Sequence, residues 1–128
     1  MQSPILEFES TSFAVSDGED EATNPGVYGQ SLALWLAARL QIAEADVIAE
    51  DFGWCIPVAD APHRLYVACA SEDHRKDRWC VFVFAEGGLL ARLFGQDRRA
   101  QEVKSVFQRI RELLAAQPEV HALVEREA

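Results

Sequence analysis

Basic residues are almost absent from the first half of this chain. Residues 1–62 contain eleven Asp and Glu but a single base, Arg39, for a net charge of −10. Residues 63–128 contain ten acids and eleven Lys and Arg, for a net charge of +1, and the whole chain carries −9. Phosphate binding requires a basic surface, so this distribution argues against nucleic acid as a partner. It favours a cationic partner, most simply a basic protein surface.

Long apolar runs, an export signal and paired cysteines are also missing. No run of eighteen apolar residues occurs, so we expect no membrane-spanning segment. The first residues lack a basic region followed by a long apolar stretch, so we expect no signal peptide. The three cysteines are odd in number and have no CxxC spacing, which favours reduced thiols. These absences together predict a cytoplasmic protein.

The composition is that of one folded domain. The chain has 128 residues, of which 49% are hydrophobic and 26% charged, far from the composition of disordered proteins. We therefore expect a single domain over residues 1–128. Within it, residues 16–24 are predicted to form an acidic loop and residues 118–128 a mobile C-terminal tail.

Four segments have the pattern of β-strands, namely residues 5–9, 47–58, 64–70 and 79–85. The short links between the last three favour an antiparallel meander. Residues 79–85 are apolar on both faces, which predicts a central place in the sheet or a partner that covers the second face. The same apolar surplus leaves open a homodimer formed through a sheet face.

Three helices are expected. Asn24 and Pro25 suit an N-cap and a first helical residue, so a long helix is predicted from there to about residue 42. A second long helix, between Asp97 and Pro118, follows from an apolar stripe with helical spacing. A short helix at residues 89–94 would precede it. The sequence thus predicts an α+β fold with a mainly antiparallel sheet of about four strands and two long helices on one face. The expected order is β-α-β-β-β-α, with the short helix before the last.

The segment from Glu50 to Trp54 is unusual for the start of a strand, because acidic residues are disfavoured there. One interpretation is a recognition site in which Glu50 and Asp51 bind a cationic group and Trp54 stacks on it. The other is a bulged strand entrance with solvated acids and a tryptophan in the core. Both interpretations are open at this stage.

Two further groups of residues, near the starts of the two expected long helices, are unusual for a helix. Gly26 and Gly29 flank Tyr28, and we attribute them to close packing of the helix against the sheet. An anion site there is disfavoured, because the acids of residues 19–21 would repel an anion and complement the helix dipole. Arg98 and Arg99 could bind a carboxylate or phosphate, but pairing with acids of the first half is favoured.

The cysteines and histidines do not have the spacing of a metal site. Cys55, Cys69 and Cys80 lie on three consecutive expected strands, with His63 and His74 in the connections, and no two form a tight ligand pair. Buried thiols that pack as small apolar groups are the default interpretation. We therefore expect no metal, no cofactor and no catalytic residue.

Three short segments together resemble a small uncharacterised bacterial protein family. They are Asn24-Pro25-Gly26-Val27-Tyr28-Gly29, Leu32-Ala33-Leu34-Trp35-Leu36 and Glu50-Asp51-Phe52-Gly53-Trp54. The resemblance runs from about Asn24 through the last helix. It implies that Glu50, Asp51, Gly53 and Trp54 form one feature, and it implies no activity or ligand.

These observations predict a non-catalytic cytoplasmic protein that binds another protein through an acidic surface, and the charge favours a basic partner. Immunity proteins against toxins and secretion chaperones are small, acidic and soluble in this way, although secretion chaperones begin with a helix and this chain with a strand. Two alternatives stay open. One is a small enzyme or small-molecule binder with a pocket around Tyr28, Glu50, Asp51, Trp54 and Arg98. The other is a structural or regulatory subunit that dimerises through an apolar face.

Overall fold

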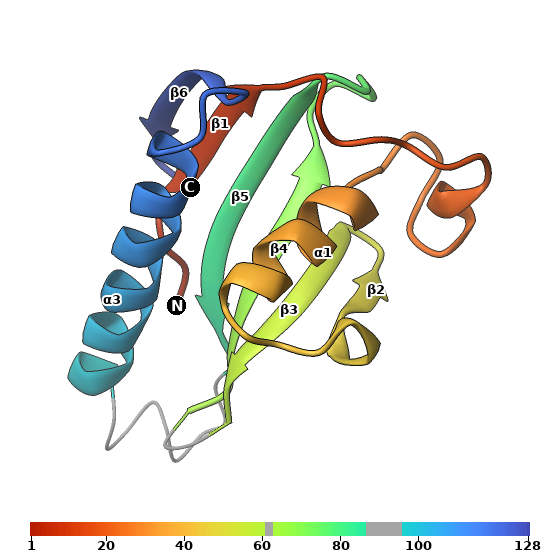
Figure 1. Cartoon of the computed structure of the whole chain (residues 1–128). Coiled ribbons are helices and arrows are strands. Elements are labelled where there is room, and N and C mark those ends of the chain that lie inside the picture. Colours follow the sequence, from red (N-terminus) through yellow and green to blue (C-terminus); the bar gives the residue numbers. More distant parts are fainter. Residues whose placement is uncertain (61–62, 87–95) are drawn as a thin grey trace.

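The computed structural model describes residues 1–60, 63–86 and 96–128, without the side chains of residues 96–98. The described chain forms a curled antiparallel sheet of six strands in the order β2-β3-β4-β5-β1-β6, shown in Figure 1. The strands are β1 (Ile5–Glu9), β2 (Ile48–Glu50), β3 (Gly53–Ala59), β4 (Leu65–Ser71), β5 (Arg78–Ala85) and β6 (His121–Arg126). Two α-helices occur among the described residues, α1 (Gln30–Arg39) and α3 (Gln96–Ala115).

Strands β2 to β5 form a continuous meander, so the predicted antiparallel meander is confirmed. Strand β1 pairs with β5 on one side and with β6 on the other. Strand β5 therefore lies between β4 and β1, which confirms its predicted central place. Its pairing aligns Phe84 with Tyr66 and Val81 with Leu6.

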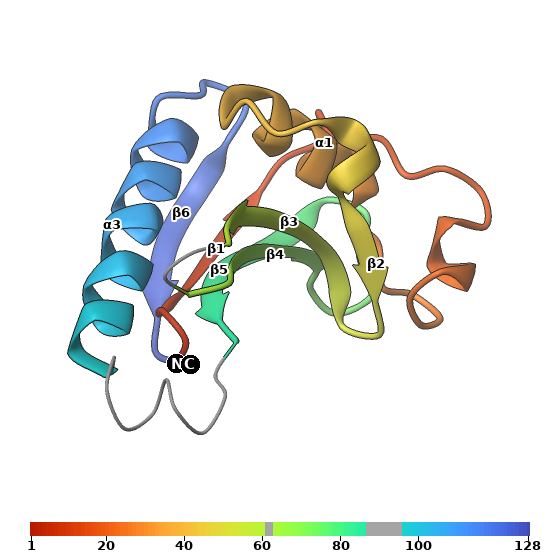
Figure 2. The same cartoon turned by 90° about the horizontal axis from the view of Figure 1, so that it is seen from below.

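Both helices cover the same face of the sheet, and the hydrophobic core lies between them and the strands (Figure 2). Helix α1 packs on β3 and β4, and α3 packs on β5. Trp79 is 1% exposed, and its indole nitrogen donates a hydrogen bond to the carbonyl oxygen of Ser10 at 3.1 Å. The opposite face of the sheet carries no helix among the described residues, and we call it the free face.

The expected sheet of about four strands is wrong, because the sheet has six. Residues 47–58 form a hairpin of β2 and β3 instead of one strand, with the turn at Asp51 and Phe52. The expected C-terminal tail contains β6. Both missed strands lie at sheet edges and are largely exposed, so they have no strong alternation of buried and exposed residues.

The expected pair of long helices is also wrong, because α1 has only ten residues. It begins at Gln30 and not near Asn24, since the carboxylate of Glu19 accepts hydrogen bonds from the backbone nitrogens of Gly29 and Gln30, each at 3.1 Å. This buried carboxylate satisfies two of the unpaired N–H groups at the helix start and complements its dipole. The short helix expected at residues 89–94 lies outside the described residues.

Two glycines allow other segments to approach β4 closely. A Cβ atom at Gly29 would lie 2.8 Å from the carbonyl oxygen of Cys69, and one at Gly53 would lie 2.5 Å from the same oxygen. Both glycines also have positive φ angles, 144° and 153°. Gly29 is therefore a packing glycine, as predicted from the sequence.

Candidate functional site

The free face carries an exposed aromatic surface over strands β3 to β5. Because successive side chains of a strand point to opposite faces, residues of β5 alternate between the core and the free face. Val81 and Val83 are fully buried towards the helices, whereas Phe82 and Phe84 lie half-buried on the free face. Phe52, in the turn between β2 and β3, is 47% exposed and lies over the same surface.

Four rings of the free face contact one another, and we call them the aromatic cluster: Phe52, Tyr66, Phe82 and Phe84. Tyr66 and Phe84 stack with their centroids 5.2 Å apart and their planes inclined by 20°. Phe52 meets the edge of Phe84 at 5.9 Å. Contiguous exposed apolar surface of this kind marks binding sites more often than scattered apolar side chains do.

The aromatic cluster forms one wall of a small cavity, which we call the aromatic pocket. Its volume is about 220 Å³, and its lining is Ile48, Glu50, Phe52, Cys55, Tyr66, Phe84 and Glu86. A shallower hollow of about 440 Å³ lies beside it, lined by Met1, Gln2, Phe52, Phe82, Phe84 and Ala85. Phe52 and Phe84 belong to both cavities, so the two cavities adjoin along these rings.

Two carboxylates give the aromatic pocket a negative charge. Among the described residues, no cationic group lies within 4 Å of Glu50. Glu86 lies 3.8 Å from Arg64, but both side chains are more than half exposed, so this pair contributes little. Burial and, to a smaller extent, the negative charge of Glu50 together raise the pKa of the Cys55 thiol to about 12. The pocket therefore combines a neutral thiol with an uncompensated carboxylate.

The structure separates Glu50 from Trp54. Glu50 pairs with Gly53 and lines the aromatic pocket, whereas Trp54 pairs with Ala49 and lies in the core, 8% exposed. Trp54 therefore does not stack on a ligand held by Glu50. Phe52, Tyr66 and Phe84 are the rings beside Glu50 instead.

The other predicted site residues also lie apart from the aromatic pocket. Asp51 is exposed in the turn, where its backbone oxygen accepts a hydrogen bond from the Asn24 side chain at 2.9 Å. Tyr28 is half-buried, and its backbone nitrogen donates to Ser71 Oγ at 3.0 Å. Arg99 is only 4% exposed. The side chain of Arg98 lies outside the described part of the chain. Of the five predicted residues whose side chains the structure describes, Glu50 alone lines the aromatic pocket.

A signal for the missed residues was present in the sequence. The apolar character of both faces of residues 79–85 comes from Phe82 and Phe84, which project from the free face. Tyr66 could be added only once the register with Phe84 was known, and Phe52 only once the turn was known. The pattern of one strand therefore indicated the surface but not its composition.

The charge asymmetry along the chain becomes weaker in space. Strand β1, from the acidic half, lies between β5 and β6 from the other half, and Glu7 pairs with Arg126 and with Arg78. The carboxylate of Glu19 accepts hydrogen bonds from backbone N–H groups at the start of α1. Four exposed acids flank β2 in the chain, namely Glu44 and Asp46 just before the strand, Glu50 at its end and Asp51 in the turn that follows. We call these four residues the acidic corner.

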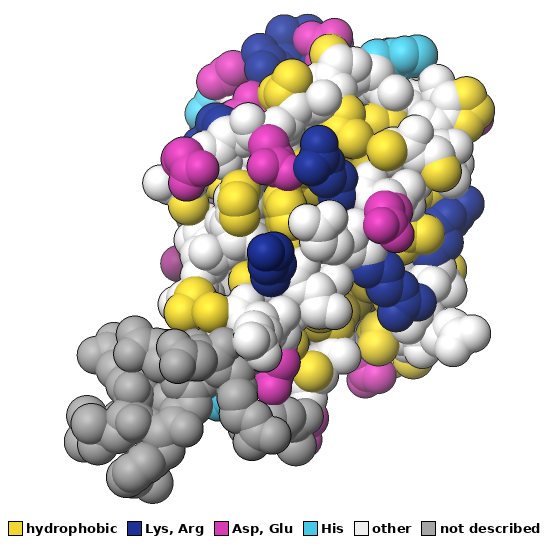
Figure 3. Space-filling view, turned by 90° about the vertical axis from the view of Figure 1, so that its left-hand side faces the viewer, with side chains coloured by type: hydrophobic (Ala, Val, Ile, Leu, Met, Phe, Trp, Pro, Cys, Tyr) yellow, Lys and Arg dark blue, Asp and Glu magenta, His cyan; other side chains and the backbone are white. Residues whose placement is uncertain are grey.

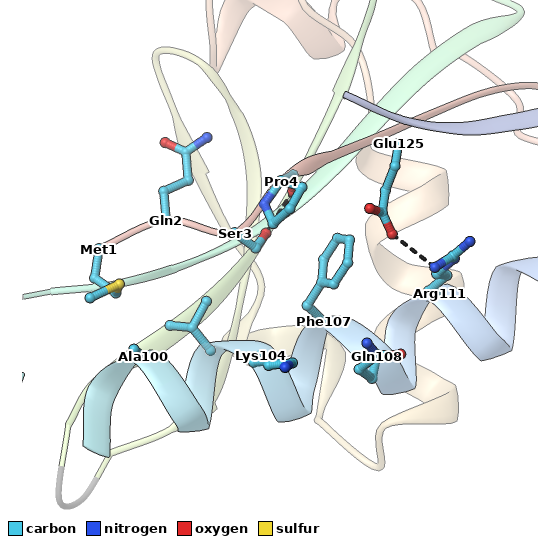
Figure 4. Close-up of a pocket in the computed structure, with 11 residues that line it drawn as sticks. Met1, Gln2, Ser3, Pro4, Ala100, Lys104, Phe107, Gln108, Arg111 and Glu125 are labelled. Carbon is cyan, nitrogen blue, oxygen red and sulfur yellow. Dashed lines mark hydrogen bonds and ion pairs between the residues drawn. The ribbon is translucent and has the colours of Figure 1, made fainter. Parts of the chain in front are cut away.

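A larger groove lies between the N-terminal segment, α3 and β6 (Figure 4). Its volume is about 380 Å³, and Phe107 and Val103 contribute to its apolar surface. Arg111 is paired with Glu125 at 2.9 Å, and Lys104 is exposed. The buried polar side chain of its lining, Ser3, donates to the Pro4 carbonyl and accepts from the Val83 nitrogen. The groove thus offers no unsatisfied buried polar group to orient a ligand.

Charges of both signs are interspersed on this side of the molecule, as Figure 3 shows. This mixture differs from the acidic corner, where the four exposed side chains have one sign. The free face and the acidic corner together are therefore the more distinctive surface.

The described residues give no indication of a metal centre or a membrane span. No group of three or more His, Cys, Asp or Glu side chains among them could hold a metal ion. No helix in the described part of the chain combines the length and the apolarity needed to cross a membrane. Cys55, Cys69 and Cys80 are free and buried, as the default interpretation predicted. Burial also raises the pKa of the Cys69 thiol. Burial and the negative charge of Glu72 raise the pKa of the Cys80 thiol to about 12.

We compared the chain with protein-family models, with curated proteins and with solved structures, and none of the three comparisons found a match. The resemblance to a small bacterial family therefore stays a prediction.

Proposed function

We propose that this chain is a non-catalytic protein-binding module that holds its partner on the free face of the sheet. The observation that carries the proposal is the aromatic cluster, four rings linked through Phe84 on a face that no described helix covers. Aromatic side chains bury a large area and are enriched at the centres of protein interfaces. The polar boundary given by Glu50 and Glu86 matches the usual arrangement of an apolar centre and a polar rim.

The charge around the free face favours a basic partner. The acidic corner adds Glu44, Asp46 and Asp51 to Glu50 on the same edge of the sheet. Such a surface attracts a cationic protein and accelerates its association at low ionic strength. An immunity-like or chaperone-like role belongs to this class of function. The reduced thiols expected from the sequence support a cytoplasmic location for the proposed binding.

A second copy of the chain fits the free face less well. In a two-fold dimer the same patch of both copies meets, so the uncompensated Glu50 of each copy would enter the interface. Burying like charges is unfavourable. Charge complementarity therefore favours a different, basic chain over a homodimer.

The test is capture of the partner by tagged protein from native-host lysate at low and at high salt, identified by mass spectrometry. We compare the natural sequence with Phe82→Ser and with Val124→Ser. Phe82 belongs to the aromatic cluster, whereas Val124 is 54% exposed on β6 at the far edge of the sheet. We expect a stoichiometric basic protein that is weakened by salt, lost with Phe82→Ser and kept with Val124→Ser.

Thermal unfolding of all three proteins checks that each is folded. A partner that binds the Phe82→Ser protein as well as the natural one contradicts the proposal, because the interface then lies elsewhere. A lysate that yields no stoichiometric partner, together with a dimer in sedimentation equilibrium, contradicts it in favour of the homodimer.

A further inference from the structure

The aromatic pocket has the size of one side chain. Its volume of about 220 Å³ is below the roughly 300–1,000 Å³ of pockets that take drug-sized ligands. It also lies on an open sheet face, where a macromolecule can reach it, and opens beside the shallower hollow next to Phe82. A projecting side chain of a protein partner therefore suits it better than a free small molecule.

The lining of the pocket selects the chemistry of that side chain. Phe52, Tyr66 and Phe84 present ring surfaces, and Glu50 presents a carboxylate without a cation among the described residues. An arginine guanidinium is flat, weakly hydrated and always charged, so it can stack on a ring and bind a carboxylate at the same time. A lysine ammonium is a compact and strongly hydrated charge, so it uses the ring surfaces less well.

Glu86 has a different role from Glu50. It already lies 3.8 Å from Arg64, which also lies 3.4 Å from Asp60. Arg64 is not part of the lining of the aromatic pocket. Glu86 thus has an arginine of its own chain nearby, whereas among the described residues no cation lies within 4 Å of Glu50, so Glu50 is the carboxylate left for a cation from outside.

We propose that the aromatic pocket binds an arginine side chain of the protein partner, with its guanidinium on the carboxylate of Glu50 and its plane against the aromatic cluster. This inference rests on the proposed function and specifies what the partner contributes. It assigns the specificity of the free face to Glu50 and its binding area to the rings.

The test is a titration of the full chain with each of three short peptides. Binding is followed by the backbone amide signals of the protein in NMR spectra. The first peptide is acetyl-Gly-Arg-Gly-amide. In the second, citrulline replaces the arginine, so that the side chain is neutral but has nearly the same shape. In the third, lysine replaces the arginine. The arginine peptide should shift the amide signals of Phe52, Cys55, Tyr66 and Phe84. We expect the citrulline peptide to bind about tenfold more weakly, because it lacks the charge-assisted hydrogen bonds.

The matched variants are Glu50→Gln and Glu44→Gln. Both remove one exposed acid from the acidic corner, but Glu44 does not line the aromatic pocket. Glu50→Gln should weaken the arginine peptide about tenfold and leave the citrulline peptide unchanged. Glu44→Gln should bind both peptides like the natural sequence.

Several results would overturn the inference. They are equal binding of the arginine and citrulline peptides, lysine binding as tight as arginine, an unchanged affinity in Glu50→Gln, and no shift with any peptide. If the lysate partner is then lost with Phe82→Ser but kept with Glu50→Gln, the proposed function stands and only the arginine site fails. If the same signals shift with protein concentration alone, a second copy occupies the face and both proposals fail.

Discussion

On strand β5, Val83 is fully buried against the helices, while its neighbours Phe82 and Phe84 lie half-buried on the other side of the sheet. The same strand therefore supplies large apolar side chains to two faces, and the helices of the described residues cover one of them. A protein whose sole requirement was stability would place polar residues on the uncovered face. The apolar side chains on the uncovered face are the observation that supports the proposed binding role.

The two faces also differ in how they treat acids. On the helix-covered side, Glu19 is buried and its carboxylate is occupied by the start of α1. On the free face, Glu50 is exposed and has no cationic neighbour among the described residues. The first acid contributes to the fold, and the second is available to a partner.

The largest expected effect comes from removing the core ring Trp54 on β3, compared with removing Phe52 in the adjacent β2–β3 turn. Trp54→Ala should lower the free energy of unfolding by about 3–5 kcal/mol, because it empties space in the core. Phe52→Ala should cost about 1 kcal/mol or less, because 47% of Phe52 is already exposed. Urea unfolding measures both.

Equal losses of unfolding free energy in Trp54→Ala and Phe52→Ala would contradict this expectation, because the free face would then be as important for stability as the core. A Phe82→Ala variant gives a second test of the free face. It should behave like Phe52→Ala and not like Trp54→Ala.

A smaller effect is expected from the acid that holds the covering helix. Glu19→Ala should destabilise the fold by about 1–2 kcal/mol, because two backbone N–H groups at the start of α1 lose their acceptor. The matched variant Glu21→Ala removes an exposed acid of the same short turn and should change stability by about 0.5 kcal/mol at most. Thermal unfolding compares the two. Equal losses would mean that the Glu19 carboxylate has no special role in starting α1.

The smallest expected effect is a loss of stability at high pH, and it tests whether water is excluded from Cys55 and Cys80 under the free face. Cys55 and Cys80 have pKa values raised to about 12, mainly by burial, whereas an unfolded thiol titrates near 8.5. Stability is fully present below pH 8.5 and falls as pH rises towards 12, since the unfolded state then releases protons that the folded state keeps. At pH 9.5 we expect a loss of roughly 1 kcal/mol for each thiol.

Denaturant unfolding between pH 7 and 10 measures this loss, with a Cys55→Ala and Cys80→Ala double variant as the control for lysine and tyrosine titration. The natural sequence should lose stability more steeply than the double variant. Identical slopes would show that water reaches both thiols from the free face.

Local pattern was sufficient for part of the fold. The strands β1, β3, β4 and β5, the meander, and the apolar stripe of α3 follow from the spacing of apolar residues in the sequence. The edge strands β2 and β6 could not be read in this way, because exposed residues have no periodic burial. The start of α1 could not be read either, because its capping acid, Glu19, lies ten residues before Gly29 in the sequence.

The sequence by itself determined that this is an α+β chain with acids concentrated in its first half and an apolar surplus on residues 79–85. Only the tertiary structure decided which residues share a face. In one continuous strand, Glu50, Phe52 and Trp54 would project to the same side, because side chains repeat every second residue. The turn at Asp51 and Phe52 reverses the chain, so Glu50 pairs with Gly53 and Trp54 points into the core. Because of this single turn, Phe52 and not Trp54 is the ring that lies beside Glu50.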